Sequence, residues 1–292
     1  MKFKFAIISF LVLLGCTKNN APTLPLLYFV PQNSAVIIKI NDKSAFSSEL
    51  ESSHLLKSLS STAAYTAIIN KISALQYFST NAESILAFVE SGKDNFEIIF
   101  IAENGEDFMQ LEEAMDRKVE QISHANKGFD KYVIEGITFF TAVFQDKIVV
   151  GTSQILIENL MGNEKQWSAD PVLNKLYDIA NDQNSANIFI NTDKGKSVLN
   201  PILADGANIH LSKFADWISL DLDTNKDHLR LNGISTVYDS VPKLVDLFKN
   251  THALVNKTPD IAPESSNAIL SYTFDRYRTF AANQAKYLNR RE

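Results

Sequence analysis

Apolar and polar residues follow two different periods along this chain, and the switches between them predict a mixed fold. Short runs rich in Val, Ile and Phe, either alternating with polar residues or continuously apolar, favour β-strands. We expect strands at 35–40, 85–90, 96–102, 131–135, 137–144, 147–151, 186–191, 217–223 and 228–235. Apolar residues three and four positions apart predict helices. These are expected after 41–42, at about 62–75, from 104 to 122, after 152–153, from 170, at 195–203 and after 239–240. The fold class is therefore α+β, a mostly antiparallel sheet covered by helices.

Two of these elements can be predicted in more detail. The run 96–102 has four consecutive apolar residues from Ile98 to Ile101, which is typical of a central strand covered on both faces. Asn104 is expected to cap a helix with an apolar face. That face consists of Phe108, Leu111, Met115, Val119 and Ile122, at helical spacings.

Residues near the C-terminus repeat a pattern seen near the start of the folded chain. Both 31–42 and 263–275 read as a proline, a polar turn, an apolar strand and an aspartate, followed by a helix, and Ala268 lies 233 positions after Ala35. A genuine repeat gives a truncated second unit of one strand and one helix. That pair either completes the sheet of the first unit or leaves the chain shorter than its relatives. The alternative is chance similarity of two strand starts.

The first twenty residues differ in character from the rest. Two lysines precede an apolar run from Phe5 to Leu14, which is too short to span a bilayer and has the length of a signal-peptide core. The run ends in Leu-Leu-Gly15-Cys16, which resembles the lipobox of bacterial lipoproteins. The resemblance implies cleavage between Gly15 and Cys16 and a diacylglyceryl group, with chains such as palmitate, on the thiol of Cys16. An ordinary secretory signal or an uncleaved N-terminal anchor are the alternatives.

Lipidation of Cys16 would fix where the protein is found. Two or more acyl chains hold a protein stably on a bilayer, so the mature protein is expected to be anchored in the cell envelope without a transmembrane segment. Cys16 is the only cysteine, so no internal disulfide can form. Lys18 stands near the anchor where some bacteria place an aspartate to retain lipoproteins at the inner membrane, which favours the outer membrane.

Composition is that of a folded, acidic protein. Hydrophobic residues make up 45% of the chain and aromatic residues 10%, which excludes disorder as the main state. Cleavage before Cys16 leaves 277 of the 292 residues and removes two lysines, which changes the net charge from −6 to −8. This charge argues against nucleic acid as a partner and against binding to anionic lipid through net charge.

Several short motifs together resemble a poorly characterised family of bacterial envelope lipoproteins with an α+β domain. The lipobox is followed by Val30-Pro31 with Ala35 at a strand start and by a late repeat of that start. Between them lies a Y-x-x-x-G-I-x-F pattern, carried by Tyr132, Gly136, Ile137 and Phe139. The resemblance covers most of the mature chain but implies no activity and no functional residue.

Motifs that carry chemistry are weak in this chain. The sequence has no G-x-S-x-G, P-loop or dinucleotide-binding pattern, and no cofactor is expected. Ser240 and Lys243 match S-x-x-K of penicillin-recognising enzymes, but their S-D-N partner is absent. An N-cap serine with a solvated lysine explains the same residues without chemistry and is the better interpretation. The histidines lack zinc-ligand spacing. They are His54, His124, His210, His228 and His252.

The predicted hairpin of 217–223 and 228–235 holds the one candidate metal loop. Alternation pairs Leu222 with Leu229 across the strands. Oxygen ligands alternate like those of a calcium loop at Asp221, Asp223, Asn225 and Asp227. However, Lys226 stands where the loop needs glycine and Asn232 where it needs glutamate, so a polar turn is the better interpretation and no metal site is assigned.

These observations divide the chain into a signal peptide (1–15), a lipidated tether (16–34), an α+β domain (35–255) and a partial second repeat or closing strand and helix (256–292). The leading functional hypothesis is an envelope lipoprotein that acts as a binding or scaffold module. It would contact the lipid bilayer through Cys16 and an envelope protein or glycan through its folded part. The alternative is an envelope hydrolase whose acid and base meet only in the fold.

Overall fold

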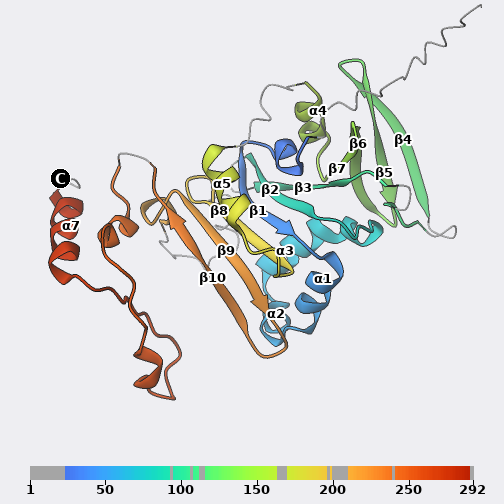
Figure 1. Cartoon of the computed structure of the whole chain (residues 1–292). Helices are drawn as coiled ribbons and strands as arrows, with labels where there is room; N and C mark the ends of the chain where they lie inside the picture. Colours follow the sequence, from blue (N-terminus) through green and yellow to red (C-terminus); the bar gives the residue numbers. More distant parts are fainter. Residues whose placement is uncertain are drawn as a thin grey trace, which may run out of the picture.

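One antiparallel sheet of ten strands organises the described part of this computed structural model (Figure 1). The structure describes residues 24–92, 95–105, 108–111, 116–162, 170–195, 198, 210–238 and 241–289. The strand order is β10-β9-β8-β1-β2-β3-β7-β6-β5-β4. The strands are β1 (Ser34–Ile40), β2 (Ser84–Gly92), β3 (Asn95–Glu103), β4 (Arg117–His124), β5 (Lys127–Ile134), β6 (Ile137–Phe144), β7 (Lys147–Gly151), β8 (Ala186–Asn191), β9 (Trp217–Thr224) and β10 (Leu229–Thr236). The predicted α+β class with a mostly antiparallel sheet is confirmed.

Helices and short 3-10 turns lie on both faces of this sheet (Figure 1). The α-helices are α1 (Lys43–Ser52), α2 (His54–Leu59), α3 (Ala63–Ile72), α4 (Gln154–Gly162), α5 (Pro171–Ile179) and α7 (Tyr277–Asn289). The 3-10 turns are η1 (Leu26–Phe29), η2 (Ser73–Tyr77), η4 (Leu211–Lys213), η5 (Leu244–Phe248) and η6 (Thr258–Asp260). The sheet therefore forms the middle layer of three.

Each face of the sheet has its own apolar core. On one face η1, α4 and α5 contribute Phe29, Ile157 and Leu173. On the other face η2 and the loop after β3 contribute Tyr77 and Phe108. Strand β3 supplies both cores, because Ile99 and Ile101 face the first and Ile98, Phe100 and Ala102 face the second. The expectation of a central strand covered on both faces is confirmed.

Side-chain caps explain where two predicted helices begin. The Asp42 carboxylate accepts a hydrogen bond of 2.8 Å from the backbone N–H of Ala45, and α1 starts at the next residue after Asp42. At α5, the Asp170 carboxylate accepts from the N–H of Val172 at 2.8 Å, and Pro171 occupies the first turn, where its missing N–H costs nothing. Both starts were predicted from the sequence.

The helix predicted from Asn104 to Ile122 is wrong, because its described residues 104–105, 108–111 and 116–122 are not helical. Residues Arg117–His124 form β4, an edge strand paired with β5. Ala125 and Asn126 have φ angles of 50° and 62° and make a tight turn between these strands. Most of β4 is exposed, so it lacks the apolar alternation that would have identified a strand.

The predicted hairpin of β9 and β10 exists, but its predicted register is wrong by two residues. Leu231 pairs with Leu222, and Leu229 pairs with Thr224. The Asn225 side-chain oxygen accepts from the N–H groups of Asp227 and His228 at 2.9 and 3.1 Å, and the turn between the strands lies one residue later than predicted. A shift of two keeps every side chain on its face, so alternation alone cannot detect it.

One predicted helix lies largely outside the described residues, and another is wrong in its described part. At 195–203 the structure describes only Gly195 and Val198, and neither Asp239 nor Ser240 is described. The helix expected from there to Phe248 is only the 3-10 turn η5 in its described part, with Lys243 as N-cap.

The apolar run at 268–274, predicted to be a strand, adds none to the sheet. Phe274 of this run forms an isolated β-bridge with Ala253. Strand β1, which it resembles in sequence, has β2 and β8 as neighbours on either side. The helix expected next is present as α7. The repeat and the domain boundary at 255 stay predictions.

Candidate functional site

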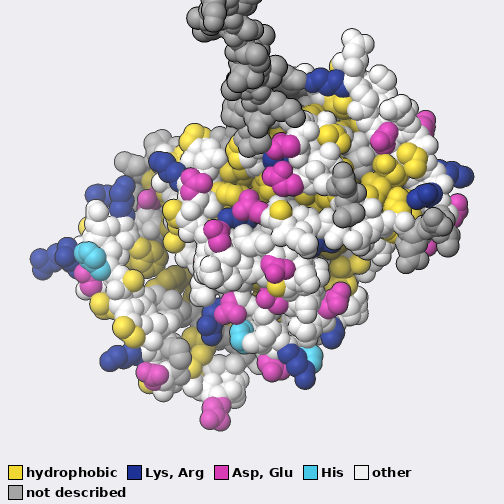
Figure 2. Space-filling model, turned by 45° about the vertical axis from the view of Figure 1, so that its right-hand side comes forward, with side chains coloured by type: hydrophobic (Ala, Val, Ile, Leu, Met, Phe, Trp, Pro, Cys, Tyr) yellow, Lys and Arg dark blue, Asp and Glu magenta, His cyan; other side chains and the backbone are white. Residues whose placement is uncertain are grey.

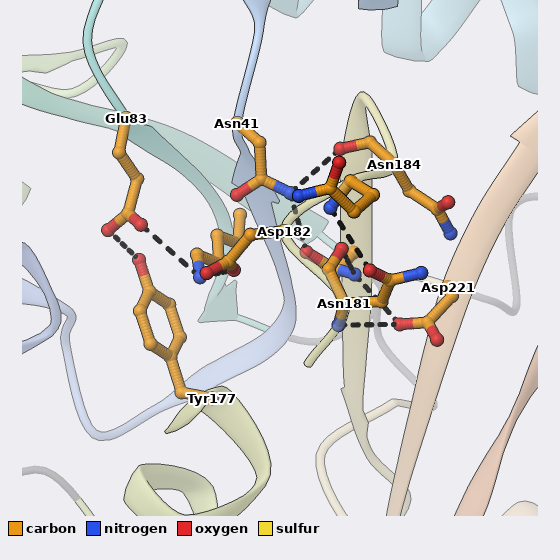
Figure 3. Close-up of polar contacts among 10 residues, drawn as sticks. Asn41, Glu83, Tyr177, Asn181, Asp182, Asn184 and Asp221 are labelled. Atoms are coloured by element: carbon orange, nitrogen blue, oxygen red, sulfur yellow. Dashed lines mark hydrogen bonds and ion pairs between the residues drawn. The ribbon is translucent and has the colours of Figure 1, made fainter. Parts of the chain in front are cut away.

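A buried lysine near the end of β1 forms a cluster with three charged or polar side chains, Asp182, Glu83 and Tyr177 (Figure 3). Lys39 is 4% exposed, and its ammonium lies 2.6 Å from Asp182 Oδ1 and 3.3 Å from Glu83 Oε2. The Tyr177 hydroxyl donates to Glu83 Oε1 at 2.6 Å. The same tyrosine places its ring 4.7 Å from the Lys39 ammonium and stacks on Phe189. The cluster ties α5 and two loops to β1.

The surroundings of this cluster raise the pKa of both Lys39 and Tyr177. Burial alone would lower the pKa of Lys39, but the hydrogen bonds and charges of Asp182 and Glu83 outweigh it and raise that pKa. Burial and the hydrogen bond to Glu83 raise the pKa of Tyr177 well above its usual range. Lys39 is therefore an ammonium and Tyr177 a phenol at neutral pH, and neither can act as a general base.

A second polar network lies beside the first (Figure 3). The fully buried Asn187 of β8 donates to Asp221 Oδ1 of β9 at 2.8 Å and to the Asn181 carbonyl at 3.1 Å. Its own side-chain oxygen accepts from Asn41 at 2.8 Å. Asn41 also donates to the carbonyl of Asn184 at 2.9 Å. These bonds satisfy the buried amide and fasten the loop before β8 to three strands.

A cavity of about 300 Å³ lies between η1, the start of α5 and β9. Asp170 and Trp217 form part of its wall, and the Trp217 Nε1–H donates to Asp170 Oδ2 at 3.2 Å. The other oxygen of Asp170 caps α5. Lys194, whose pKa is lowered by burial, donates to the carbonyl of Gln32 at the rim. Among the described lining residues Asp170 is the one carboxylate, and both of its oxygens accept hydrogen bonds from within the fold.

Residues 249–289, called the C-terminal arm below, project from the end of the sheet where β10 lies (Figure 1). An aromatic cluster holds the arm together. The Phe248 ring of η5 lies 5.4 to 5.6 Å from the rings of Tyr272, Phe274 and Phe280. Asn283 of α7 adds hydrogen bonds to two carbonyls of the chain around η5. The arm and η5 therefore share a small aromatic core.

Outside that cluster the arm exposes much apolar surface. Twenty large apolar side chains are exposed in the described part of the chain, and eight of them belong to these 41 residues. The most exposed are Val255 at 82%, Ile261 at 83% and Leu270 at 79%. Leu254, Val255, Ile261 and Tyr272 surround a shallow hollow. Such a concentration of exposed apolar groups is typical of a binding surface.

The sequence-predicted site residues do not meet in one place. Gly15 and Cys16 lie outside the described residues. Asp221 belongs to the Asn187 network, Asp223 lies 3.6 Å from Arg230, and Asn225 closes the turn. Asp227 lies 3.8 Å from His54. Among the described residues, no three His, Cys, Asp or Glu side chains are grouped to hold a metal ion.

Lys243 of the S-x-x-K pattern is not solvated, contrary to the sequence-based interpretation. It is 7% exposed, and its ammonium lies 3.0 Å from Asp216 and 2.6 Å from the Ser212 carbonyl. Ser240 is outside the described residues. Sequence reasoning missed this buried pair, as it missed that of Lys39, because the partners of both lysines are distant in the chain.

None of the helices in the described ranges is long and apolar enough to cross a bilayer. Comparison with protein-family models, with curated proteins and with solved structures found no match to this chain. The site must therefore be interpreted from its own chemistry.

Proposed function

We propose that this chain is a lipid-anchored binding or scaffold module of a bacterial cell envelope, at the outer membrane. Acylation of Cys16 would hold it on the bilayer, and the C-terminal arm would be its binding surface. The anchor is supported by the two lysines, the apolar run and the Gly15-Cys16 junction. The exposed apolar surface of the arm is the observation that carries the binding role.

The anchor can be tested on the intact protein. Mass spectrometry of the mature N-terminal peptide should show acyl groups on Cys16, and Cys16→Ser should release the folded chain or leave an uncleaved precursor. The fold should survive, because Cys16 lies 18 positions before the first strand, which begins at Ser34. An unmodified Cys16 thiol on membrane-bound protein would contradict this prediction.

Site-specific photo-cross-linking in intact cells tests the binding surface. A photoreactive amino acid at Ile261 should form adducts with whatever covers the arm, because this side chain is 83% exposed. The control position is Val119 of β4, which is 54% exposed and lies at the opposite end of the sheet. Adducts at both positions or at neither would refute the arm as the binding surface.

A further inference from the structure

The net charge of the chain hides a strong asymmetry between the arm and the rest. The arm (249–289) holds five lysines and arginines against three aspartates and glutamates, a net charge of +2, and residues 290–292 add one more positive charge. The first 248 residues hold 21 basic against 30 acidic residues, a net charge of −9. The five basic residues of the arm that the structure describes are all exposed. They are Lys249, Lys257, Arg276, Arg278 and Lys286.

The arm therefore presents basic and apolar side chains on one projecting segment. Figure 2 shows the two kinds side by side at the left of the molecule, where the arm lies. Tyr272 and Tyr277 add rings that are 55% and 73% exposed. Aromatic rings with a polar tip favour the boundary between water and lipid, and basic groups favour anionic headgroups.

We propose that the C-terminal arm is a second membrane contact, which docks on a bilayer containing anionic phospholipid. This inference rests on the proposed function, in which the arm is the binding surface, and names its partner. Val255, Ile261 and Leu270 would enter the headgroup region, while the lysines and arginines would pair with lipid phosphates.

Chain length allows the anchor and the arm to reach one surface. Eight residues separate Cys16 from Leu24, and eight residues span at most about 26 to 29 Å. The first described element, η1, packs on β2 and β3. Strand β2 is four places from β10, or about 19 Å at about 4.8 Å per strand. An anchor on Cys16 would also raise the effective concentration of the arm at the bilayer.

The shape of the apolar surface favours a bilayer over a folded protein. Its most exposed side chains come from three separate stretches of largely irregular chain around the η6 turn, and the hollow between them is shallow. A protein partner has to match such a surface in shape, whereas lipid adapts to it. A second copy of the chain, whose acidic part could also attract the arm, is treated as an outcome of the test.

Co-sedimentation with vesicles tests the proposal on unlipidated protein. Residues 17–292, the mature chain without Cys16, contain every described residue and lack the acylation site. Vesicles of phosphatidylglycerol and phosphatidylethanolamine should bind it at least about tenfold more tightly than vesicles of phosphatidylcholine alone. Raising the salt from about 0.1 M to about 1 M, which shortens the Debye length from about 10 to about 3 Å, should weaken that preference.

Two variants separate the apolar and the charged contributions. Val255→Asp with Ile261→Asp, and separately Lys257→Glu with Arg278→Glu, should each weaken binding to the anionic vesicles by at least about tenfold. The control is Val119→Asp, which makes the same chemical change at the far end of the sheet and should bind like the wild type. All variants should keep the wild-type circular dichroism, since the altered side chains are exposed.

Three results would overturn the inference. The wild type could bind both kinds of vesicle equally or not at all, the arm variants could bind like the wild type, or analytical ultracentrifugation could show a dimer that the arm variants abolish. If the arm still cross-links to a protein in cells, the binding role stands and only the lipid partner is wrong. If the arm forms no adducts at all, the proposed function fails as well.

Discussion

Removing the two carboxylates around Lys39 is expected to cost far more stability than removing Lys39 itself. One variant is Glu83→Gln with Asp182→Asn, which keeps the shapes of the partners and removes their charges. The other is Lys39→Met, which keeps the length of the buried side chain and removes its ammonium. The comparison is informative because the three groups differ in exposure.

The exposures set the size of each effect. The Lys39 side chain is 5% exposed, whereas those of Glu83 and Asp182 are 41% and 70% exposed. The double variant leaves a buried ammonium without a counter-charge, which costs about 3–5 kcal/mol. Lys39→Met leaves two carboxylates that water can solvate, and Tyr177 can still donate to Glu83. We expect that substitution to cost no more than about 1 kcal/mol.

The pH dependence of the two variants has opposite signs. In the wild type the pKa of Lys39 is raised, so its contribution is complete below its unfolded value of about 10.4 and is lost as pH rises through the folded pKa. In the double variant only burial remains, so the folded pKa of Lys39 falls below the unfolded value. The loss of stability of that variant relative to the wild type should therefore become smaller as pH rises from 7 toward about 10.

Urea unfolding, followed by tryptophan fluorescence between pH 7 and 10, measures these differences. Differences taken against Lys39→Met cancel the titration of the other groups. Lys131→Met is a control for an exposed pair, because Lys131 lies 3.3 Å from Glu120 at side-chain exposures of 33% and 66%, and it should cost no more than about 0.5 kcal/mol. The reasoning is refuted if Lys39→Met costs as much as the double variant, or if the loss of stability of the double variant grows with pH.

Two further substitutions test the backbone of the sheet by the same unfolding assay. Gly233→Ala should destabilise the fold by at least about 2 kcal/mol, because a Cβ built there meets the Ser219 carbonyl oxygen at 1.8 Å, whereas Gly162→Ala, with nothing within 4 Å, should be neutral within about 0.5 kcal/mol. Equal effects of the two would contradict the close approach of β10 to β9. Ala125→Gly should stabilise by about 0.5–1 kcal/mol, since Ala125 has a φ of 50°, and a loss of stability would mean that this turn is not strained.

Local patterns were enough to predict much of the sheet. Continuous apolar residues identified β3 as central, and an aspartate followed by proline identified the start of α5. These signals work because they lie within the element itself. Either its apolar residues have to be buried, or its capping side chain accepts a hydrogen bond from the first backbone N–H groups of the helix.

The sequence was insufficient where the secondary structure of a segment depends on a neighbouring strand. Val119 and Ile122 have helical spacing, yet they belong to β4, because β5 offers a strand to pair with. The run at 268–274 has the composition of β1 but lacks neighbouring strands on both sides. Of the candidate site, the sequence singled out Asp221, but for a metal rather than for its bond to Asn187.

The buried lysines show why the candidate site had to be found by structure. Lys39 lies within an apolar run and reads as a core strand, and its partner Asp182 is 143 residues away. Lys243 was interpreted as solvated, and its partner Asp216 is in a different element. No local sequence pattern predicts a buried ion pair of this kind, because the acidic partner looks like an ordinary surface residue.

Burial of the central strands on both faces favours the arm as the functional surface. Both faces of the central strands are buried under helices and turns, and the polar clusters around Lys39 and Asn187 are satisfied within the fold. The edge strand β4 carries charged residues such as Arg117 and Lys118, a common protection against pairing with other chains. The arm instead exposes Val255, Ile261 and Leu270 beside its basic side chains. Exposure of this kind costs solubility, so it is retained most readily in a segment that is covered when the protein is at work.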